Sequence, residues 1–168
     1  YELSQVGDIP EQMPLQVPFR HLCNLLLIAA GNIDQALASF PGTEEASPEA
    51  KRRMRRRAEC AWNWIQNFAP EEFRFTLRTG NEEPEEVSEA ERAALGDVRA
   101  EVESGISGRD EKELEQALYD IAQKHEFASK DFFALMYRVL IGREKGPRLA
   151  GFLQTIGAER VLRILSRY

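Results

Sequence analysis

Residues 129–153, with the sequence SKDFFALMYRVLIGREKGPRLAGFL, decide the fold of this chain. Apolar residues recur at helical spacing on both sides of the short segment between Gly142 and Gly146. Pro147 follows directly and suits the first turn of a second helix. The pattern predicts two helices joined by a basic hinge. Because the N–H groups at the start of a helix attract anions, this hinge favours a nucleic-acid ligand over enzyme chemistry.

The same helical spacing of apolar residues recurs through most of the chain. It predicts helices in the ranges 18–30, 33–40, 47–69, 88–104, 110–125, 132–140, 147–156 and 158–165. Ser47 with Pro48, and Ser88 with Glu91, are typical of helix starts. Residues 73–78 alternate apolar and polar side chains, but no partner strand is evident, so we expect an extended connector. The sequence therefore predicts an all-α fold, a bundle or cage of about eight helices with little or no sheet.

Breaks in the helical pattern suggest how the chain is organised. Residues 1–16 are polar and proline-spaced, and we expect them to be a lead-in. Residues 17–78 then form a first helical lobe, 79–109 an acidic linker and helix, and 110–168 a C-terminal helical cage. Because the chain begins at Tyr1 rather than methionine, we expect it to be part of a longer protein.

Charge is distributed unevenly along the 168 residues. The formal net charge is −6 overall, but it is −1 over residues 1–70, −10 over 71–126 and +5 over 127–168. A phosphate backbone responds to the local potential more than to the total charge. We therefore expect the acidic middle of the chain to face away from any nucleic acid.

Several classes of protein are excluded by simple patterns. Cys23 and Cys60 lie in apolar helical patterns, which does not indicate a secreted disulfide scaffold. No cluster of cysteine and histidine indicates a metal site. The longest apolar run, at 25–30, is far too short to span a membrane, and no signal peptide is visible. We expect a cytoplasmic protein without a metal ion.

Nothing in the sequence predicts catalytic residues, because the carboxylates lie on solvated faces and offer no acid–base pair. Basic residues give the stronger signal. The candidate RNA-binding residues are Arg143, Lys145 and Arg148 in the hinge, Arg138 and Lys130 on the preceding helix, and Arg20 on the first helix. Arg20, His21 and Asn24 form a polar strip that faces a ligand, belongs to a satisfied buried network, or contacts a neighbouring domain.

Two further features have two interpretations each. The basic run at 51–57 binds either an RNA backbone or the acidic segment at 82–91. Aromatic side chains either stack on unpaired bases or lie in the core. The aromatic candidates are Trp62, Trp64, Phe73, Phe75 and Tyr137.

The block LMYRVLIGREKGPRL at 135–149, followed by Phe152-Leu153, Ile156-Gly157 and RVL at 160–162, resembles a known family. It is similar to the end of the anticodon-binding helical cage of class I aminoacyl-tRNA synthetases. KDFF at 130–133, VPFRHL at 17–22, and AWNWI with APEEF between 61 and 73 look closer to class I lysyl-tRNA synthetase. The resemblance covers most of 17–78 and 110–167.

This resemblance implies a parent enzyme that activates lysine with ATP and transfers it to tRNA. The catalytic signatures HIGH and KMSKS of that enzyme belong to its N-terminal catalytic domain and are absent from this sequence. The chain alone is then expected to be non-catalytic and to need no cofactor. Its partners would be the anticodon arm of tRNA and its own catalytic domain. The alternatives are an acidic helical module that binds protein, and the equivalent domain of a glutamyl-tRNA synthetase.

Overall fold

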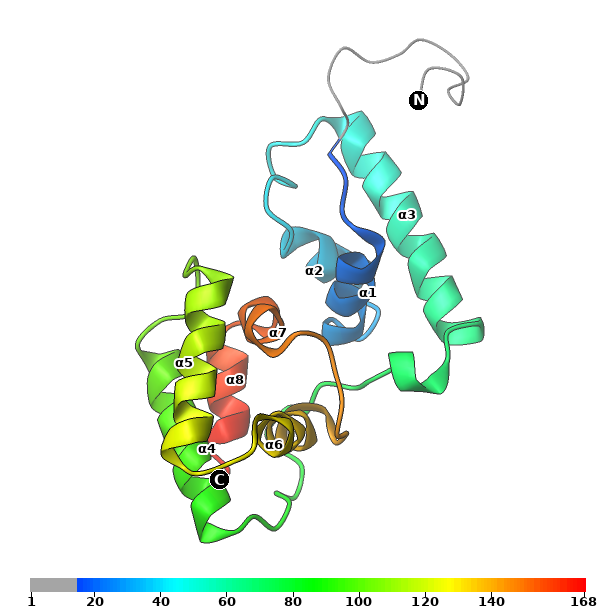
Figure 1. The fold of residues 1–168 in the computed structure, drawn as a ribbon. Coiled ribbons are helices and arrows are strands. Elements are labelled where there is room, and N and C mark those ends of the chain that lie inside the picture. Colours follow the sequence, from blue (N-terminus) through cyan, green and yellow to red (C-terminus); the bar gives the residue numbers. More distant parts are fainter. Residues whose placement is uncertain (1–14) are drawn as a thin grey trace. The chain divides into compact units, whose positions relative to one another are not determined.

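A computed structural model describes residues 15–168 (Figure 1). These residues contain eight α-helices, one 3₁₀ helix and no strand, which confirms the predicted all-α fold. The chain divides into two compact units, the first ending at Pro70 and the second running over Glu71–Tyr168. Most of the expected lead-in at 1–16 lies outside the described residues, which begin at 15.

Three helices build the described part of the first unit: α1 (Phe19–Ile28), α2 (Ile33–Ala38) and α3 (Pro48–Asn67). Local side chains fix where two of them begin. The Asn32 side chain accepts a hydrogen bond of 3.1 Å from the Gln35 N–H at the start of α2. Ser47 accepts one of 3.2 Å from the Ala50 N–H at the start of α3. Each cap satisfies an N–H group that the first helical turn leaves without a partner.

The core of this unit lies between α1 and α3. Helix α1 is buried along most of its length, whereas α3 buries the single stripe Met54, Ala58, Ala61 and Ile65. The turn after α1 fits closely against α3, because a Cβ atom on Gly31 would lie 2.4 Å from the indole of Trp62. Phe19, which the helical spacing places in the apolar stripe of α1, is instead 50% exposed. It is the first residue of α1, where it packs edge-on against Trp64 of α3 and leaves half of its surface exposed.

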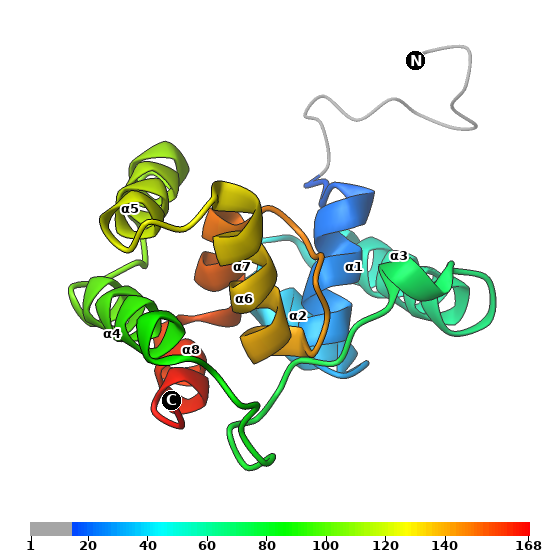
Figure 2. The same ribbon diagram turned by 60° about the horizontal axis from the view of Figure 1, so that its bottom comes forward.

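The second unit contains the short 3₁₀ helix η2 (Glu71–Phe73) and five α-helices. These are α4 (Glu89–Glu103), α5 (Glu111–Lys124), α6 (Ser129–Ile141), α7 (Leu149–Ile156) and α8 (Ala158–Leu165). The predicted capping box is confirmed, because Ser88 accepts from the Glu91 N–H and Glu91 accepts from the Ser88 N–H. Asp110 caps α5 by accepting from the N–H groups of Lys112 and Glu113. Helix α8 packs against α4, which lies beside it in Figure 2, and it also contacts α6 and α7.

The connector at 74–88 belongs to the second unit. The Arg78 N–H donates a hydrogen bond of 2.9 Å to the carbonyl of Leu140, near the end of α6. Arg143 donates through Nη1 to the carbonyl of Glu71, at 2.7 Å. These two bonds hold residues 71–78 against α6 and its hinge, whereas the sequence-based division places those residues with the first lobe.

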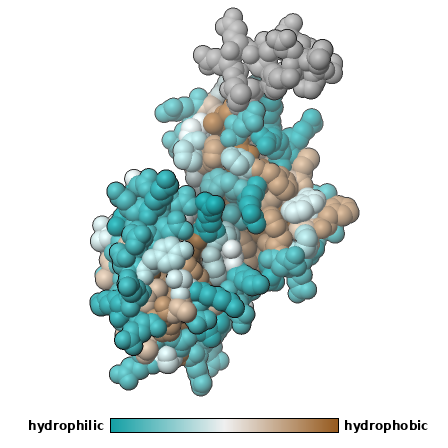
Figure 3. Space-filling model, in the orientation of Figure 1, coloured by the Kyte–Doolittle hydropathy of each residue, from teal (hydrophilic) through white to brown (hydrophobic). Residues whose placement is uncertain are grey.

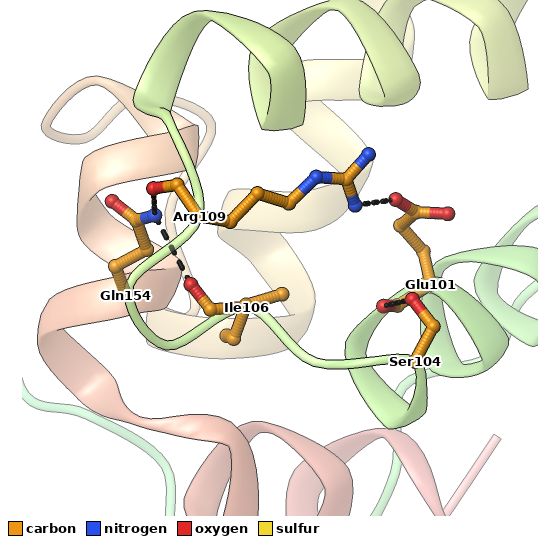
Figure 4. A network of polar contacts seen from close by, with 5 residues as sticks. All are labelled: Glu101, Ser104, Ile106, Arg109 and Gln154. Carbon is orange, nitrogen blue, oxygen red and sulfur yellow. Dashed lines mark hydrogen bonds and ion pairs between the residues drawn. The ribbon is translucent and has the colours of Figure 1, made fainter.

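The loop between α4 and α5 is fastened from two sides (Figure 4). Gln154, on α7, donates through Nε2 to the carbonyls of Ile106 and Arg109, at 3.1 and 2.8 Å. The Arg109 guanidinium forms an ion pair with Glu101 on α4. Together these contacts fix the loop over the buried side chain of Ile106.

Candidate nucleic-acid interface

The hinge between α6 and α7 has a fixed backbone. Helix α6 ends at Gly142, whose φ of 68° lies in the left-handed region that glycine adopts without strain. The Tyr137 hydroxyl donates to the carbonyl of Pro147 at the far end of the hinge. A Cβ atom on Gly146 would lie 2.7 Å from two carbons of the Tyr137 ring, so the backbone rests directly on this ring.

Tyr137 remains a hydrogen-bond donor over the physiological pH range. Its side chain is buried, and burial disfavours the phenolate, which raises the pKa of Tyr137 to about 12. The bond from its hydroxyl to the hinge is therefore available across the physiological pH range. The aromatic ring itself is enclosed, so Tyr137 supports the hinge and offers no surface for stacking on a base.

Two cations of the hinge point into solvent. Lys145 and Arg148 are exposed and form no ion pair with any residue that the structure describes. Arg143 is half-buried and its Nη1 is engaged by the Glu71 carbonyl. The hinge thus presents two available positive charges on a backbone that is already ordered, which reduces the entropy lost when an anion binds.

The start of α7 is a weaker anion site than the sequence indicates. The carboxylate of Glu111, on α5, lies against the first turn of α7, since a Cβ atom on Gly151 would be 3.1 Å from its Oε1. A carboxylate at this position interacts favourably with the positive end of the helix dipole. The negative charge of Glu111 therefore already compensates the positive end of α7. The hinge side chains provide most of the attraction for an anion.

Neither candidate on α6 joins the hinge cations. Arg138 is held in an ion pair, and Lys130 lies at the other end of the helix. Arg138 forms an ion pair of 2.6 Å with Glu91, which joins α6 to α4. The pKa of Glu91 is lowered first by the Ser88 N–H and further by this arginine. Lys130 is exposed in the first turn of α6, at the opposite end of the helix from Arg143. The structure therefore groups Lys145, Arg148 and Arg143, and leaves Lys130 separate.

The remaining candidate, Arg20, lies in the first unit. It is exposed on α1. Its neighbour His21 packs against the ring of Phe40, with 5.8 Å between ring centroids, and burial lowers the pKa of His21. His21 therefore packs inside the unit, Arg20 is exposed to solvent, and the ligand-facing role of Arg20 stays a prediction.

The remaining aromatic candidates are all partly exposed: Trp62, Trp64, Phe73 and Phe75. Trp62 packs on Gly31, and Phe75 packs edge-on against Phe152 with ring centroids 5.3 Å apart. Trp64 is half-exposed and meets the exposed ring of Phe19 edge-on, also at 5.3 Å.

Phe68, at the end of α3, is 71% exposed, and Figure 3 shows hydrophobic side chains gathered over this end of the helix. Sequence reasoning missed Phe19 and Phe68 as surface aromatics because both fall on helical apolar spacing.

Other kinds of site are not indicated in residues 15–168. The described residues contain no cluster of three or more histidine, cysteine or acidic side chains that could hold a metal ion. None of the helices in this part of the chain is long and apolar enough to cross a membrane.

Comparison with known proteins assigns the chain to a class. No family model matches it. Its curated relatives are aminoacyl-tRNA synthetases, and among them are lysine–tRNA ligases of bacteria and archaea. The protein of Treponema pallidum is 43% identical over 172 residues, covering 100% of this chain and 31% of that enzyme. The protein of Borreliella burgdorferi is 33% identical, covering 100% of this chain and 32% of that enzyme. The protein of the archaeon Methanopyrus kandleri is 34% identical over 98% of this chain and 32% of that enzyme.

The chain is therefore related along its whole length to lysine–tRNA ligases, and it spans about a third of their length. This confirms the resemblance to class I lysyl-tRNA synthetases that the hinge block and the scattered N-terminal motifs predict.

Proposed function

We propose that this chain is the C-terminal, anticodon-binding part of a class I lysine–tRNA ligase. The parent enzyme would use ATP to join lysine to its tRNA in the cytoplasm, and that chemistry would take place in a catalytic domain outside this chain. The chain itself would hold the anticodon arm and so place the acceptor end of the tRNA. The observation that carries the proposal is the exposed pair Lys145 and Arg148 on a fixed hinge, within a chain related throughout to lysine–tRNA ligases.

The phosphate contacts would come from the hinge. Lys145 and Arg148 project from a backbone that Tyr137 and Gly146 hold in place, and Arg143 adds a third charge beside them. An arginine guanidinium matches a phosphate with two parallel hydrogen bonds, while a lysine acts as a point charge. Arg138 is left out of this contact set because it pairs with Glu91.

Unpaired bases of the anticodon loop would stack on exposed aromatic rings. Phe19 and Phe68 are exposed aromatic side chains of the first unit, and Trp64 is a partly exposed one that packs beside Phe19. Stacking of one base on such a ring contributes about 1–3 kcal/mol and tolerates different bases. Arg20, next to Phe19 in sequence, would supply a nearby positive charge.

The proposal is tested by titrating the chain at low salt with three RNAs: tRNA for lysine, the same tRNA with a changed anticodon, and tRNA for glutamate. We expect preference for the first, which is lost when the anticodon is changed. Preference for the glutamate tRNA would assign the chain to a glutamyl enzyme. Absence of binding to all three would refute the proposal and favour the alternative of an acidic module that binds protein.

Hinge variants locate the contact. The double variant Lys145→Gln/Arg148→Gln removes two exposed charges. The decrease of log K with log salt should therefore become shallower, with a slope smaller in magnitude by about 1.4 to 1.8. The matched control is Arg92→Gln/Lys112→Gln, which removes two exposed charges from α4 and α5 and should leave the slope unchanged. Equal effects of the two double variants would mean that binding responds only to net charge, and the hinge assignment would be wrong.

A further inference from the structure

The first half of α3 breaks the local rules for a stable helix. Residues 51–57 carry six basic side chains, all within the first half of a helix that begins at Pro48. Positive charge near the start of a helix opposes the helix dipole. Like charges four residues apart, such as Arg52 with Arg56 and Arg53 with Arg57, repel one another. A sequence that keeps such a pattern without internal compensation marks a functional surface.

Internal compensation is present for four of the six. Arg53 pairs with Glu49 at 2.6 Å, and Arg55 pairs with Asp34 on α2. The Lys51 Nζ donates to the carbonyl of Glu44 at 2.8 Å, and Arg57 donates through Nη2 to the carbonyl of Val17 at 3.1 Å.

Arg52 and Arg56 are the other two basic residues of this run. Both are exposed, and neither forms an ion pair or a side-chain hydrogen bond with the residues described. Helical geometry places them one turn apart, about 6 Å along the axis, on the side of α3 opposite to the buried Met54 and Ala58. Farther along, the same outward side carries Asn63 and Asn67, which bond to each other through Asn67 Nδ2 at 2.8 Å.

We propose that this outward face of α3, centred on Arg52 and Arg56, is a second contact surface for the sugar–phosphate backbone of RNA. The proposal rests on the proposed function, since it presumes an RNA ligand, and it adds a contact in a different compact unit from the hinge. The flanking guanidinium groups of Arg53 and Arg55 strengthen the local positive potential even though each has an internal partner.

The chemistry of the face favours a phosphate backbone over an acidic protein surface. The cations that lack an internal partner are arginines, whose forked donors fit a phosphate. Along the outward stripe the chain continues with the exposed carboxylate of Glu59, which offsets only part of the positive charge, and then with asparagines. The exposed Phe68 and the partly exposed Trp64 lie on an adjacent side of the helix. A protein interface usually has apolar anchors at its centre, and none stands among the outward residues Arg52, Arg56, Glu59, Asn63 and Asn67.

The test uses the double variant Arg52→Gln/Arg56→Gln in the full chain. We expect the slope of log K against log salt for the lysine tRNA to fall by about 1.4 to 1.8, as two phosphate contacts require. Between 50 and 200 mM salt, wild-type affinity should then fall about tenfold more than variant affinity. Because the substitutions relieve charge repulsion, the melting temperature should stay the same or rise. The variant Arg52→Lys/Arg56→Lys should keep the wild-type slope.

Different failures have different meanings. An unchanged slope for the glutamine variant, together with a lowered slope for the hinge variant, would overturn the α3 contact and leave the proposed function intact. Absence of tRNA binding by the wild-type chain would overturn both. Equal binding of polyglutamate at the same charge concentration would overturn the assignment to RNA. A lower melting temperature of the glutamine variant would show that these arginines stabilise the helix, which contradicts the argument from uncompensated charge.

Discussion

At the scale of the residue, Gly146 is the position on which the hinge most depends. Its backbone lies on the Tyr137 ring, and that ring cannot move aside because it is buried and its hydroxyl is bonded to Pro147. The requirement for glycine here is steric, whereas at Gly142 it comes from a φ of 68°. A single hinge thus needs two glycines for two different physical reasons.

We expect Gly146→Ala to destabilise the second unit by about 1–3 kcal/mol, the usual cost of overpacking a closed site. It should also weaken tRNA binding, since the exposed hinge cations would be displaced. Urea unfolding and the tRNA titration measure the two effects. Gly96→Ala is the matched control, because a Cβ atom there meets nothing within 4 Å and alanine stabilises a helix interior by about 0.5–1 kcal/mol. Unchanged stability and unchanged tRNA binding of the Gly146→Ala variant would show that the hinge backbone can shift to accommodate a methyl group.

At the scale of the element, one side chain of α7 holds the loop between α4 and α5 (Figure 4). Gln154→Met keeps the shape of the side chain but removes the donor to the carbonyls of Ile106 and Arg109. We expect a loss of about 1–3 kcal/mol, because two partly buried acceptors lose their donor. Hydrogen exchange of the loop amides should accelerate.

The control for this loop is Gln116→Met, which removes an exposed bond of 2.9 Å to Asp120 within α5. That bond should be worth only a few tenths of a kcal/mol, about 0.2–0.5. Similar losses for the two variants would contradict the view that Gln154 acts by satisfying partly buried carbonyls.

Elements were predictable from the sequence where the decisive contacts are local. Ser47 with Pro48, the Ser88–Glu91 capping box and Gly142 mark helix ends through residues that are neighbours in the chain. Arg138 and Arg143 were not predictable in the same way. Their partners, Glu91 and the Glu71 carbonyl, lie 47 and 72 residues away in sequence. Periodicity also placed Phe19 in the core, because spacing shows which face of a helix a residue occupies and not how completely a neighbouring helix covers it.

At the scale of the whole molecule, an overall charge of −6 has to be reconciled with the polyanionic ligand that we propose. Part of the acidic segment after residue 78 is used internally. Hydrogen bonds from the backbone N–H groups of Thr79 and Gly80 lower the pKa of Glu82 to about 2, and Glu85 pairs with Arg78. Glu83 and Glu86 are exposed and form no ion pair with the described residues, so they repel RNA at long range.

The double variant Glu83→Gln/Glu86→Gln tests whether this segment faces away from the RNA. If it does, the gain in tRNA affinity should be severalfold at 10 mM salt, where charges act over about 30 Å. The gain should disappear at 150 mM salt, where they act over about 8 Å. A gain that persists at 150 mM would place the acidic segment within the interface, because only near charges escape screening. The net charge would then oppose binding at the contact itself, and the basic hinge and α3 would have to overcome it there.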